Sequence, residues 1–407
     1  MQKEKRLIPE LRFVGFEKEW QNKFFSEMLL SSRLGGNYSN SEIPNDYPLI
    51  KMGNLGRGSI KLDKLEYIDE KEELKSEDLI KEGDLFFNTR NTLDLVGKVA
   101  IWRNELPKAY YNSNLMYIKF ENNYFMNYSL NSFQGIKKLR RIATGTTSVA
   151  AIYSKDLFKL KFNIPSLEEQ QKIANFLTTI DTQIQTLEKK KSLLEQYKKG
   201  VMQKIFKQEF RFKMEDGSLF PEWVKLKLSD FLITTLREVD KPNNNYLAIG
   251  IRSHCKGTFQ KPNSDPSKNS MKKLFVVQEN DLIVNITFAW EGAIAIVKKE
   301  DEGAHVSHRF PTYTFNRDLV IHEFFKYVII QKKFRNILDL ISPGGAGRNR
   351  VMSKKEFVKI KWSIPCVEEQ TKIANFLSAI DENIALVNTK IEHTKAYKKG
   401  LLQQMFV

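Results

Sequence analysis

A long internal repeat constrains the fold of this chain more than any other feature. Residues 164–206 recur at 364–406 with a constant offset of 200 residues, and 21 of the 43 aligned positions are identical. A match of this length indicates a duplication within the chain, and its period is far too long for a solenoid. Outside the matched segments the halves correspond faintly, as in Trp20 and Trp223. The sequence therefore predicts two copies of a diverged globular domain followed by a matched segment of about 40 residues.

The matched segments carry apolar residues at alternating spacings of four and three, which predicts long helices that pair as a coiled coil. These residues are Ile173, Leu177, Ile180, Ile184 and Leu187 in the first copy, and Ile373, Leu377, Ile380, Ile384, Val387 and Ile391 in the second. Pro165 disfavours helix before it, so the first helix is expected to begin just after this residue. Ser166 and Glu169 are predicted to form a capping box at this start. In the second copy Cys366 takes the place of Ser166 and is a poorer cap. A globular domain lies between the helices in sequence, which favours an antiparallel pair. Two separate helices, each packed on its own domain, are the alternative.

The expected fold class follows from these two observations. We predict an α+β fold with a pseudo-two-fold internal repeat, in which two long antiparallel coiled-coil helices separate two globular mixed α/β domains. A chain of 407 residues is long enough for two such domains. The expected ranges are 1–160 and 208–360 for the domains, and 161–207 and 361–407 for the helices.

The charge of the chain points to a polyanionic partner. Lys and Arg number 65 against 49 Asp and Glu, a net charge of +16, of which the two helices contribute only +2. We therefore expect double-stranded DNA to bind the globular domains and no membrane partner, although a basic protein without an anionic partner is the simpler alternative. Two cysteines, a polar beginning and no long apolar run lead us to expect a cytoplasmic protein.

Several basic residues lie beside polar or glycine-rich loops at corresponding places in the two halves. Backbone amides, hydroxyls and Arg in such loops can contact phosphates, while Arg and Asn can also reach base edges. A single basic run is more often a solvated face, but its recurrence in both halves favours binding. The predicted DNA-binding residues are Arg57, Asn88, Arg90, Asn91, Lys137, Lys138, Arg140, Thr146, Thr147, Ser148, Arg348, Asn349, Arg350 and Lys354.

Motifs for catalysis are lacking. The sequence has no phosphate-binding G-x-x-x-x-G-K-[ST] and no G-x-G-x-x-G that opens a helix. His305 and His308 lack the further ligands of a tetrahedral metal site, so we predict no metal. The carboxylates of Glu168-Glu169 and Glu368-Glu369 favour helix starts without any acid–base role. The chain is predicted to recognise DNA, with no catalytic residues and no cofactor of its own.

The two copies of I-P-x-x-E-E-Q-x-K-I-A-N-F-L-x-x-I-D, each closing a diverged basic domain, resemble the specificity subunits of type I restriction–modification systems. The resemblance covers essentially the whole chain, and Trp20, Trp223, Gly83-Asp84-Leu85 and Asn280-Asp281-Leu282 match weaker markers of the family. It implies that each domain is a target-recognition domain that reads one half of a bipartite DNA sequence, and that the helices set the spacer.

The resemblance also implies partner proteins. Two methyltransferase subunits, which hold S-adenosylmethionine, would dock on the helices, and two restriction subunits that use ATP and Mg²⁺ would join the full complex. The expected partner-binding residues are Glu169, Gln170, Lys172, Asn175, Glu369, Gln370, Lys372 and Asn375. Two other functions compete with this one: a coiled-coil interaction scaffold without specific DNA binding, and a self-contained methyltransferase or nuclease with its own recognition domains.

Overall fold

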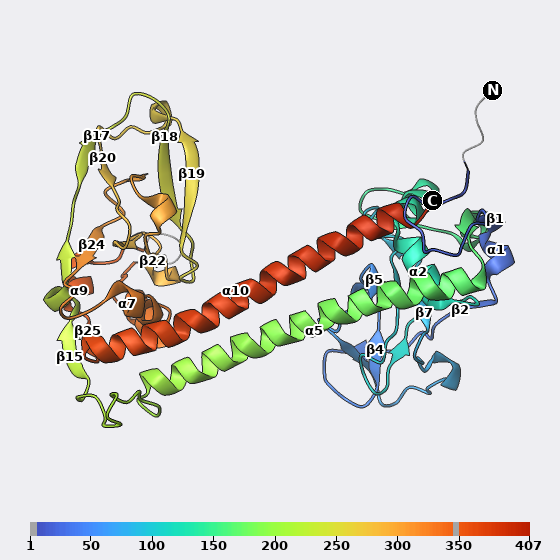
Figure 1. Ribbon diagram of the computed structural model, residues 1–407, viewed down its shortest axis with the longest axis horizontal. Helices are drawn as coiled ribbons and strands as arrows, with labels where there is room; N and C mark the ends of the chain where they lie inside the picture. The colour runs from blue at the N-terminus through green and yellow to red at the C-terminus, as the bar shows by residue number, and fades with distance from the viewer. Residues whose placement is uncertain (1–5, 345–349) are drawn as a thin grey trace. The chain divides into compact units, whose positions relative to one another are not determined.

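The computed structural model describes residues 6–344 and 350–407 of the chain. The chain folds as two compact units, Met1–Lys191 with Leu386–Val407 and Ser192–Ala385. Each unit holds one globular domain, the start of the long helix that follows this domain, and the end of the other long helix (Figure 1). The predicted α+β fold with an internal repeat is confirmed.

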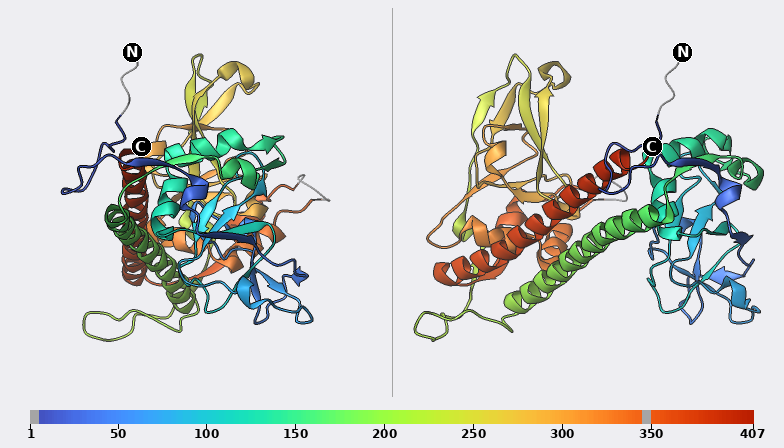
Figure 2. Two further views of the ribbon diagram at one scale, coloured as in Figure 1. Left: turned by 90° about the vertical axis from the view of Figure 1, so that its right-hand side faces the viewer. Right: turned by 45° about the vertical axis from the view of Figure 1, so that its right-hand side comes forward.

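The long helices are α5 (Leu167–Phe206) and α10 (Val367–Gln404), and they run antiparallel in both units. In the first unit the Lys398 ammonium donates to Asp181, and the Lys191 ammonium donates to Asn388 Oδ1 at 2.7 Å. From Asp181 to Lys191 the chain advances ten residues along α5, while the partner residue moves back ten residues along α10, from Lys398 to Asn388, as antiparallel helices require. In the second unit Lys198 donates to Asp381, which fits the same register. Figure 2 shows the end of α10 beside the first domain.

The first domain contains short strands in several small sheets. The order is β2-β11-β7-β9-β5 in a five-stranded sheet and β10-β4-β6-β3 in a four-stranded sheet, while β1 pairs with β14 and β12-β13-β8 form a third group. The strands are β1 (Gln21–Phe24), β2 (Ser31–Leu34), β3 (Asn40–Ser41), β4 (Pro48–Ile50), β5 (Gly58–Ser59), β6 (Glu66–Ile68), β7 (Leu85–Asn88), β8 (Arg90–Asn91), β9 (Val99–Ile101), β10 (Tyr110–Tyr111), β11 (Leu115–Lys119), β12 (Thr144–Gly145), β13 (Ala150–Ala151) and β14 (Lys161–Ile164). The helices are α1 (Phe25–Met28), α2 (Asn123–Asn131), α3 (Phe133–Ile142) and α4 (Ser154–Leu157).

The second domain repeats this plan with longer strands. Its sheets have the orders β16-β24-β21-β22 and β17-β20-β23-β18-β19, and β15 pairs with β25 as β1 pairs with β14. The strands are β15 (Val224–Lys227), β16 (Leu232–Thr234), β17 (Glu238–Asp240), β18 (Tyr246–Ile251), β19 (Thr258–Ser264), β20 (Lys273–Val276), β21 (Leu282–Val284), β22 (Ile294–Ile296), β23 (His305–Val306), β24 (Thr312–Phe315) and β25 (Lys361–Ile364). The helices are α6 (Leu228–Phe231), α7 (His322–Ile329), α8 (Lys332–Leu340) and α9 (Lys354–Lys359).

The hydrophobic core of each unit joins its domain to both long helices. In the first unit the seam residues of α5 pack with domain residues such as Trp20 and Phe125, with Leu401 of α10 and with Phe406, which follows α10. In the second unit Ile205 of α5 joins the seam of α10 in the same manner. The start of each helix therefore packs on its own domain, as in the alternative considered from the sequence. The helices also pair with each other, as the coiled-coil prediction requires.

The helix starts differ from the expected ranges. Residues 161–164 and 361–364 form the edge strands β14 and β25, and the helices begin at Leu167 and Val367. The predicted capping box forms in part, because the Glu169 N–H donates to Ser166 Oγ at 3.4 Å. The second hydrogen bond of the box, from the Ser166 N–H to the Glu169 carboxylate, was predicted wrongly. The Glu169 carboxylate accepts from the Arg12 guanidinium at 2.8 Å instead.

Candidate nucleic-acid interface

An asparagine turns the chain away from a central strand in each domain. Asn88 ends β7, is fully buried, and accepts a hydrogen bond on Oδ1 from the Arg90 N–H at 3.1 Å. In the second domain Asn285 follows β21 and accepts on Oδ1 from the Thr287 N–H, also at 3.1 Å. A side chain that bonds the backbone two residues ahead stabilises an Asx turn. Because its side chain is buried, the prediction that Asn88 contacts DNA is wrong; it supports the turn instead.

The turn in the first domain leads into a small sheet that gathers two groups of predicted residues. Arg90 and Asn91 form β8, which pairs with β13, and β13 pairs with β12. The hairpin between β12 and β13 carries three exposed hydroxyl residues, Thr146, Thr147 and Ser148. The Leu93 N–H donates to the Thr147 carbonyl at 3.1 Å, so the hairpin is tied to the chain that follows β8. Arg90, Asn91 and these hydroxyls thus lie on one edge of the domain.

The hairpin depends on Gly145. Its φ is +127°, and a Cβ there would lie 2.3 Å from the Val149 carbonyl oxygen. Both the backbone conformation and the close approach exclude a side chain. Thr146 then closes the hairpin, since its N–H donates to the Val149 carbonyl at 2.8 Å. The tight hairpin holds the exposed hydroxyls beside β8.

A cluster of cations lies near this edge. Burial lowers the pKa of Arg57, and the neighbouring Arg140 lowers it further. Burial also lowers the pKa of Lys98, with smaller contributions from Arg57 and Lys61. Arg140 lies 3.6 Å from the exposed carboxylate of Asp94. These cations repel one another, and such a surface favours an anion such as a phosphate. Sequence reasoning missed Lys61 and Lys98 because neither belongs to a basic run.

Two adjacent lysines of α3 have different environments. Lys137 is exposed on α3, three residues before Arg140 on the same helix. The Lys138 ammonium donates to the Lys161 carbonyl at 2.7 Å and lies 5.1 Å from the Phe162 ring centre, and burial lowers its pKa. This hydrogen bond supports strand β14. Because the side chain is only partly buried and an ammonium has three donors, DNA binding by Lys138 stays a prediction.

In the second domain different residues follow the equivalent turn. The exposed Arg309 donates to Thr287 Oγ1 at 3.4 Å, and the Trp290 indole N–H donates to the Thr287 carbonyl at 3.2 Å. The Met352 N–H donates to the Ile286 carbonyl at 2.8 Å and brings the chain before α9 beside the turn. Thr287, Trp290 and Arg309 carried no motif in the sequence, and the fold alone brings them together.

Two predicted residues of the second domain lie at this turn. Arg350 donates to the Ser342 carbonyl at 2.9 Å, forms an ion pair with Asp339 at 2.8 Å and lies 5.1 Å from the Trp290 ring centre. Most of its donors are therefore used within the domain. Lys354 is exposed, and its ammonium donates to the His308 carbonyl at 3.3 Å. The predicted residues Arg348 and Asn349 lie outside the described residues.

Comparison with known families is decisive for the identity of this fold. The model described as type I restriction modification DNA specificity domain matches residues 17–196 and 222–395, so one match covers each half of the repeat. The chain belongs to this family of type I restriction–modification specificity subunits.

Individual relatives agree with this assignment. The specificity subunit is 25% identical over 404 residues to the "Putative type I restriction enzyme MjaX specificity subunit" of Methanocaldococcus jannaschii, covering 95% of this chain and 92% of that one. The type I restriction enzyme MjaVIII specificity subunit of the same organism is 24% identical over 323 residues, 75% of this chain and 73% of that one. The crystal structure of a type I S subunit from M. genitalium superposes with a TM-score of 0.62 at 14% identity, covering 98% and 99% of the two chains, and shares the fold.

Each long helix of the specificity subunit begins at a buried ion pair. Glu169 accepts from the Arg12 guanidinium at 2.8 Å and from the Trp20 indole N–H at 3.3 Å. Glu369 accepts from Arg211 at 2.9 Å and from the Trp223 indole N–H at 3.1 Å. The hydrogen bond to the carboxylate raises the pKa of each arginine. Trp20 and Trp223, which mark the domain starts in the sequence, thus hold the helix starts.

The predicted partner-binding residues divide into two groups. Glu169, Gln170, Glu369 and Gln370 are buried, so the prediction that they contact partners is wrong. The two glutamines support the helix starts, for Gln170 donates to the Pro165 carbonyl at 3.0 Å and Gln370 donates to the Pro365 carbonyl at 2.9 Å. Asn175 and Asn375 are exposed, and the ammonium groups of Lys172 and Lys372 lie over Phe rings at 5.3 and 5.4 Å.

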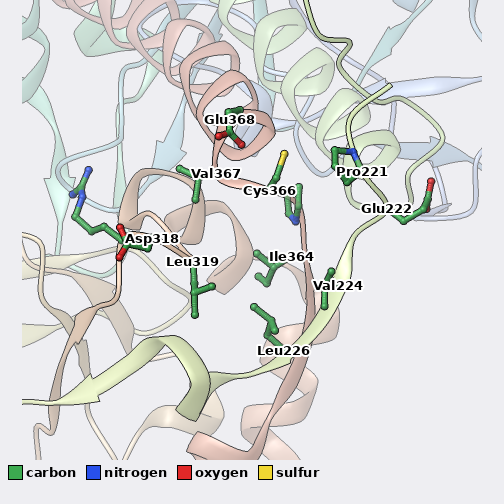
Figure 3. Close-up of a pocket in the computed structure, with 12 residues that line it drawn as sticks. Pro221, Glu222, Val224, Leu226, Asp318, Leu319, Ile364, Cys366, Val367 and Glu368 are labelled. Carbon is green, nitrogen blue, oxygen red and sulfur yellow. The ribbon is translucent and has the colours of Figure 1, made fainter. Parts of the chain in front are cut away.

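A hollow lies beside each helix start of the specificity subunit. The one in the second unit has a volume of about 570 Å³ and an apolar floor of Leu226, Leu319 and Ile364 (Figure 3). The corresponding hollow in the first unit has a volume of about 500 Å³ and lies around Pro165. Neither lining contains a histidine.

Among the described residues, 6–344 and 350–407, no cluster of three or more His, Cys, Asp or Glu side chains is arranged to hold a metal ion. In the same part of the chain, every helix is too short or too polar to cross a membrane.

Proposed function

We propose that this specificity subunit reads a bipartite sequence in double-stranded DNA, with one half-site bound by each domain. The observation that carries the proposal is the repeated Asx turn, which presents polar and basic side chains at the same place in two domains. Beyond Asn88 the side chains are Arg90 and Asn91, whereas beyond Asn285 they are Thr287 and Trp290. Different side chains on a common turn suit a target whose two halves differ in sequence.

The residues of the first domain suggest a division of labour. Arg90 and Asn91 have the donors and acceptors that distinguish guanine and adenine in the major groove, and Thr146 and Thr147 lie beside them. Arg57, Lys98 and Arg140 form the repelling cluster and would contact phosphates. Phosphate contacts fix the position of a protein on DNA and base contacts specify the sequence.

In the second domain the equivalent surface contains Thr287, Arg309 and Lys354. Arg309 is the strongest candidate for a base contact, because it is exposed and bonded to the turn by a single long hydrogen bond of 3.4 Å. Lys354 begins α9 beside it and suits a phosphate. Arg350 lies over the Trp290 ring and would hold this side chain in position at the DNA surface.

The helices would set the spacer between the half-sites and dock two methyltransferase subunits. Tyr197 and Tyr397 are identical in the repeat and remain 55% and 57% exposed. Gly200 and Gly400, one helical turn further on, would admit a Cβ without contact to any atom within 4 Å. Gly costs a helix about 1 kcal/mol relative to Ala. The chain itself gives no reason for the glycines, and close approach of a partner would explain them together with the exposed tyrosines.

The chemical steps would belong to other subunits. In this proposal the specificity subunit is non-catalytic, two methyltransferase subunits bring S-adenosylmethionine, and two restriction subunits bring ATP and Mg²⁺. The predicted partner-binding residues that stay available for docking are the exposed Lys172, Asn175 and Asn375 and the partly buried Lys372. The protein is proposed to function in the cytoplasm, where genomic DNA is present.

Methylome sequencing tests this proposal directly. Cells that express the chain with its cognate methyltransferase subunits should methylate one bipartite motif. Replacement of residues 1–160 by another recognition domain of the family should change one half of the motif and leave the other intact. Change in both halves, or no motif at all, would contradict the proposal.

Purified components separate the proposal from its rivals. DNA binding by the assembled complex should weaken steeply as salt increases, because phosphate contacts release counterions. Binding that is absent or independent of salt would favour a protein scaffold. The chain alone with DNA, Mg²⁺ and S-adenosylmethionine should neither cut nor methylate, and turnover would favour a self-contained enzyme.

A further inference from the structure

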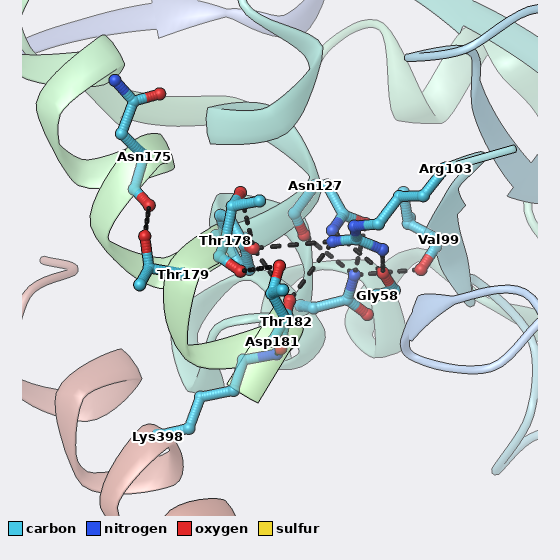
Figure 4. Close-up of polar contacts among 12 residues, drawn as sticks. Gly58, Val99, Arg103, Asn127, Asn175, Thr178, Thr179, Asp181, Thr182 and Lys398 are labelled. Atoms are coloured by element: carbon cyan, nitrogen blue, oxygen red, sulfur yellow. Dashed lines mark hydrogen bonds and ion pairs between the residues drawn. The ribbon is translucent and has the colours of Figure 1, made fainter. Parts of the chain in front are cut away.

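An aspartate in the first half of each long helix is the centre of a duplicated polar cluster. In the first unit the Tyr128 hydroxyl donates to Asp181 Oδ2 at 2.8 Å and lies 3.1 Å from Thr178 Oγ1. Figure 4 labels Asp181 and Thr178 on α5. In the second unit the Tyr327 hydroxyl donates to Asp381 Oδ2 at 2.9 Å and lies 3.1 Å from Ser378 Oγ. Both tyrosines come from a helix of the recognition domain, α2 or α7, so each aspartate binds its own domain.

The second oxygen of each aspartate binds the other long helix. Asp181 on α5 accepts from Lys398 on α10, while Asp381 on α10 accepts from Lys198 on α5. Each lysine also lies over the ring of the tyrosine that binds the same aspartate, at 5.3 Å for Tyr128 and 5.2 Å for Tyr327. Every cluster therefore joins three elements: a recognition domain and both helices.

The first of these clusters is more buried than a surface ion pair, so loss of one charged partner would leave the other buried without compensation. The side chains of Asp181 and Lys398 are 13% and 18% exposed, and Tyr128 is almost completely buried. Burial, followed by the charge of Asp181, raises the pKa of Tyr128, so this hydroxyl stays a donor. Glu188 and Lys395 pair across the same two helices at 2.7 Å, but are 48% and 47% exposed and bind no recognition domain. They provide a matched control.

The cluster in the first unit also reaches the candidate DNA edge. Arg103 donates to Asp181 Oδ2 at 3.2 Å and to the Gly58 carbonyl at 2.9 Å. Gly58 begins β5 directly after Arg57, one of the repelling cations. In the second unit the nearby cation is Lys326, which precedes Tyr327 on α7 and donates to the neutral Ser378 Oγ at 3.1 Å in place of the aspartate. The first recognition domain is therefore tied to the helix pair by an additional ion pair.

We propose that Asp181 and Asp381 are positioning residues for spacer selectivity: each fixes its recognition domain to one register of the helix pair, so that the complex accepts one separation of the half-sites. This inference rests on the proposed function. A cluster that contributed to stability alone would affect methylation equally at every separation.

The test uses the complex of the full chain with its cognate methyltransferase subunits. DNA substrates carry both half-sites, with the spacer at its natural length or changed by one or two base pairs. For Asp181→Asn and Lys398→Met, we expect the ratio of altered-spacer to natural-spacer methylation to rise about tenfold, which corresponds to 1.4 kcal/mol. The half-site sequences should stay unchanged. Asp381→Asn should give a smaller rise, because its cluster lacks a counterpart of Arg103.

Two controls separate positioning from stability. Glu188→Gln, in the exposed pair, should leave the ratio unchanged. Lys398→Arg keeps the charge and should restore the natural ratio that Lys398→Met loses. If Asp181→Asn and Lys398→Met lower methylation equally at all spacer lengths, or abolish it, the inference is overturned. If the wild-type complex methylates no bipartite site, the proposed function itself fails, an outcome distinct from a wild-type motif with unaltered variant ratios.

Discussion

The two recognition domains hold their helices with the same residues and present different residues to the candidate DNA edge. Glu169 with Trp20 and Glu369 with Trp223 form matching buried contacts, whereas Arg90 in one domain corresponds to Thr287 in the other. Both sets of residues come from the same duplication. Divergence is therefore concentrated where a half-site would be read, and the contacts that orient the domain on the helix stay alike. Four predictions test this contrast, from the largest expected effect to the smallest.

Removal of a buried carboxylate at a helix start should have the largest effect. Glu369→Ala leaves the Arg211 guanidinium, 9% exposed, without its buried partner and should lower the free energy of unfolding by about 3–5 kcal/mol. The matching variant Glu169→Ala should have a similar effect, since its Arg12 is 11% exposed. Denaturant unfolding followed by tryptophan fluorescence measures both. A loss below 1 kcal/mol in only one variant would show that the two helix starts are not equivalent, and so small a loss in both would contradict the prediction.

Arg90→Ala tests the divergent edge. If Arg90 reads a base, its loss should reduce discrimination at one position of one half-site by about 1–3 kcal/mol. The other half-site should be read as before. Competition binding with DNA substituted at single positions measures this effect, and Thr147→Ala on the neighbouring hairpin is a weaker companion. Equal loss of affinity for all sequences would instead assign Arg90 to a phosphate.

Lys98→Met should weaken binding without changing the sequence that is read. Loss of one phosphate contact should make the slope of log K against log salt shallower by about 0.9. Lys155, which is exposed and lies on α4, is a control for the loss of one charge from the same domain. An identical slope change in Lys155→Met would mean that overall charge, and not the cluster around Arg57, causes the effect.

The smallest effect is expected at the helix caps. Ser166 Oγ accepts a hydrogen bond at the start of α5, whereas Cys366 occupies the matching position of α10. Cys366→Ser should therefore stabilise the second unit by about 0.5–1 kcal/mol, and Ser166→Cys should destabilise the first by a similar amount. Thermal unfolding of the two variants beside the wild type measures both signs. Destabilisation by Cys366→Ser would mean that packing of the thiol outweighs the cap.

The sequence predicted features that repeat and missed features that depend on distant segments. Heptad spacing located the helices, and the matched positions Asp181, Lys198, Asp381 and Lys398 prove to pair across them. Glu169 was expected to contact a partner because it lies outside the apolar seam of the helix. Its burial depends on Arg12, 157 positions away in the chain, which no local pattern connects with it.

The candidate DNA edge shows the same limit. Asn88 lies in a polar basic stretch, which indicated exposure, yet the sheet buries it and leaves Arg90 at the surface. Lys98 and Arg309 are isolated cations, and the fold places them beside other polar groups. Composition and loop type can identify a polar edge, but the strands at this edge, of two to four residues, carry too little periodicity to show which side chains face it.

The core of the first domain includes residues from the end of α10 and just after it. During synthesis this core therefore cannot be complete until the last residues have been made. Leu401, Met405 and Phe406 pack with Trp20 and Phe125, and the Asn163 amide donates to the Val407 carbonyl at 2.8 Å. When the ribosome has made the first 200 residues, these partners do not yet exist. The first domain is thus the first to be synthesised and the last to receive all of its core residues. A chain cut short after residue 385 would thus leave an apolar surface open on its first domain, which marks an incomplete product for proteolysis.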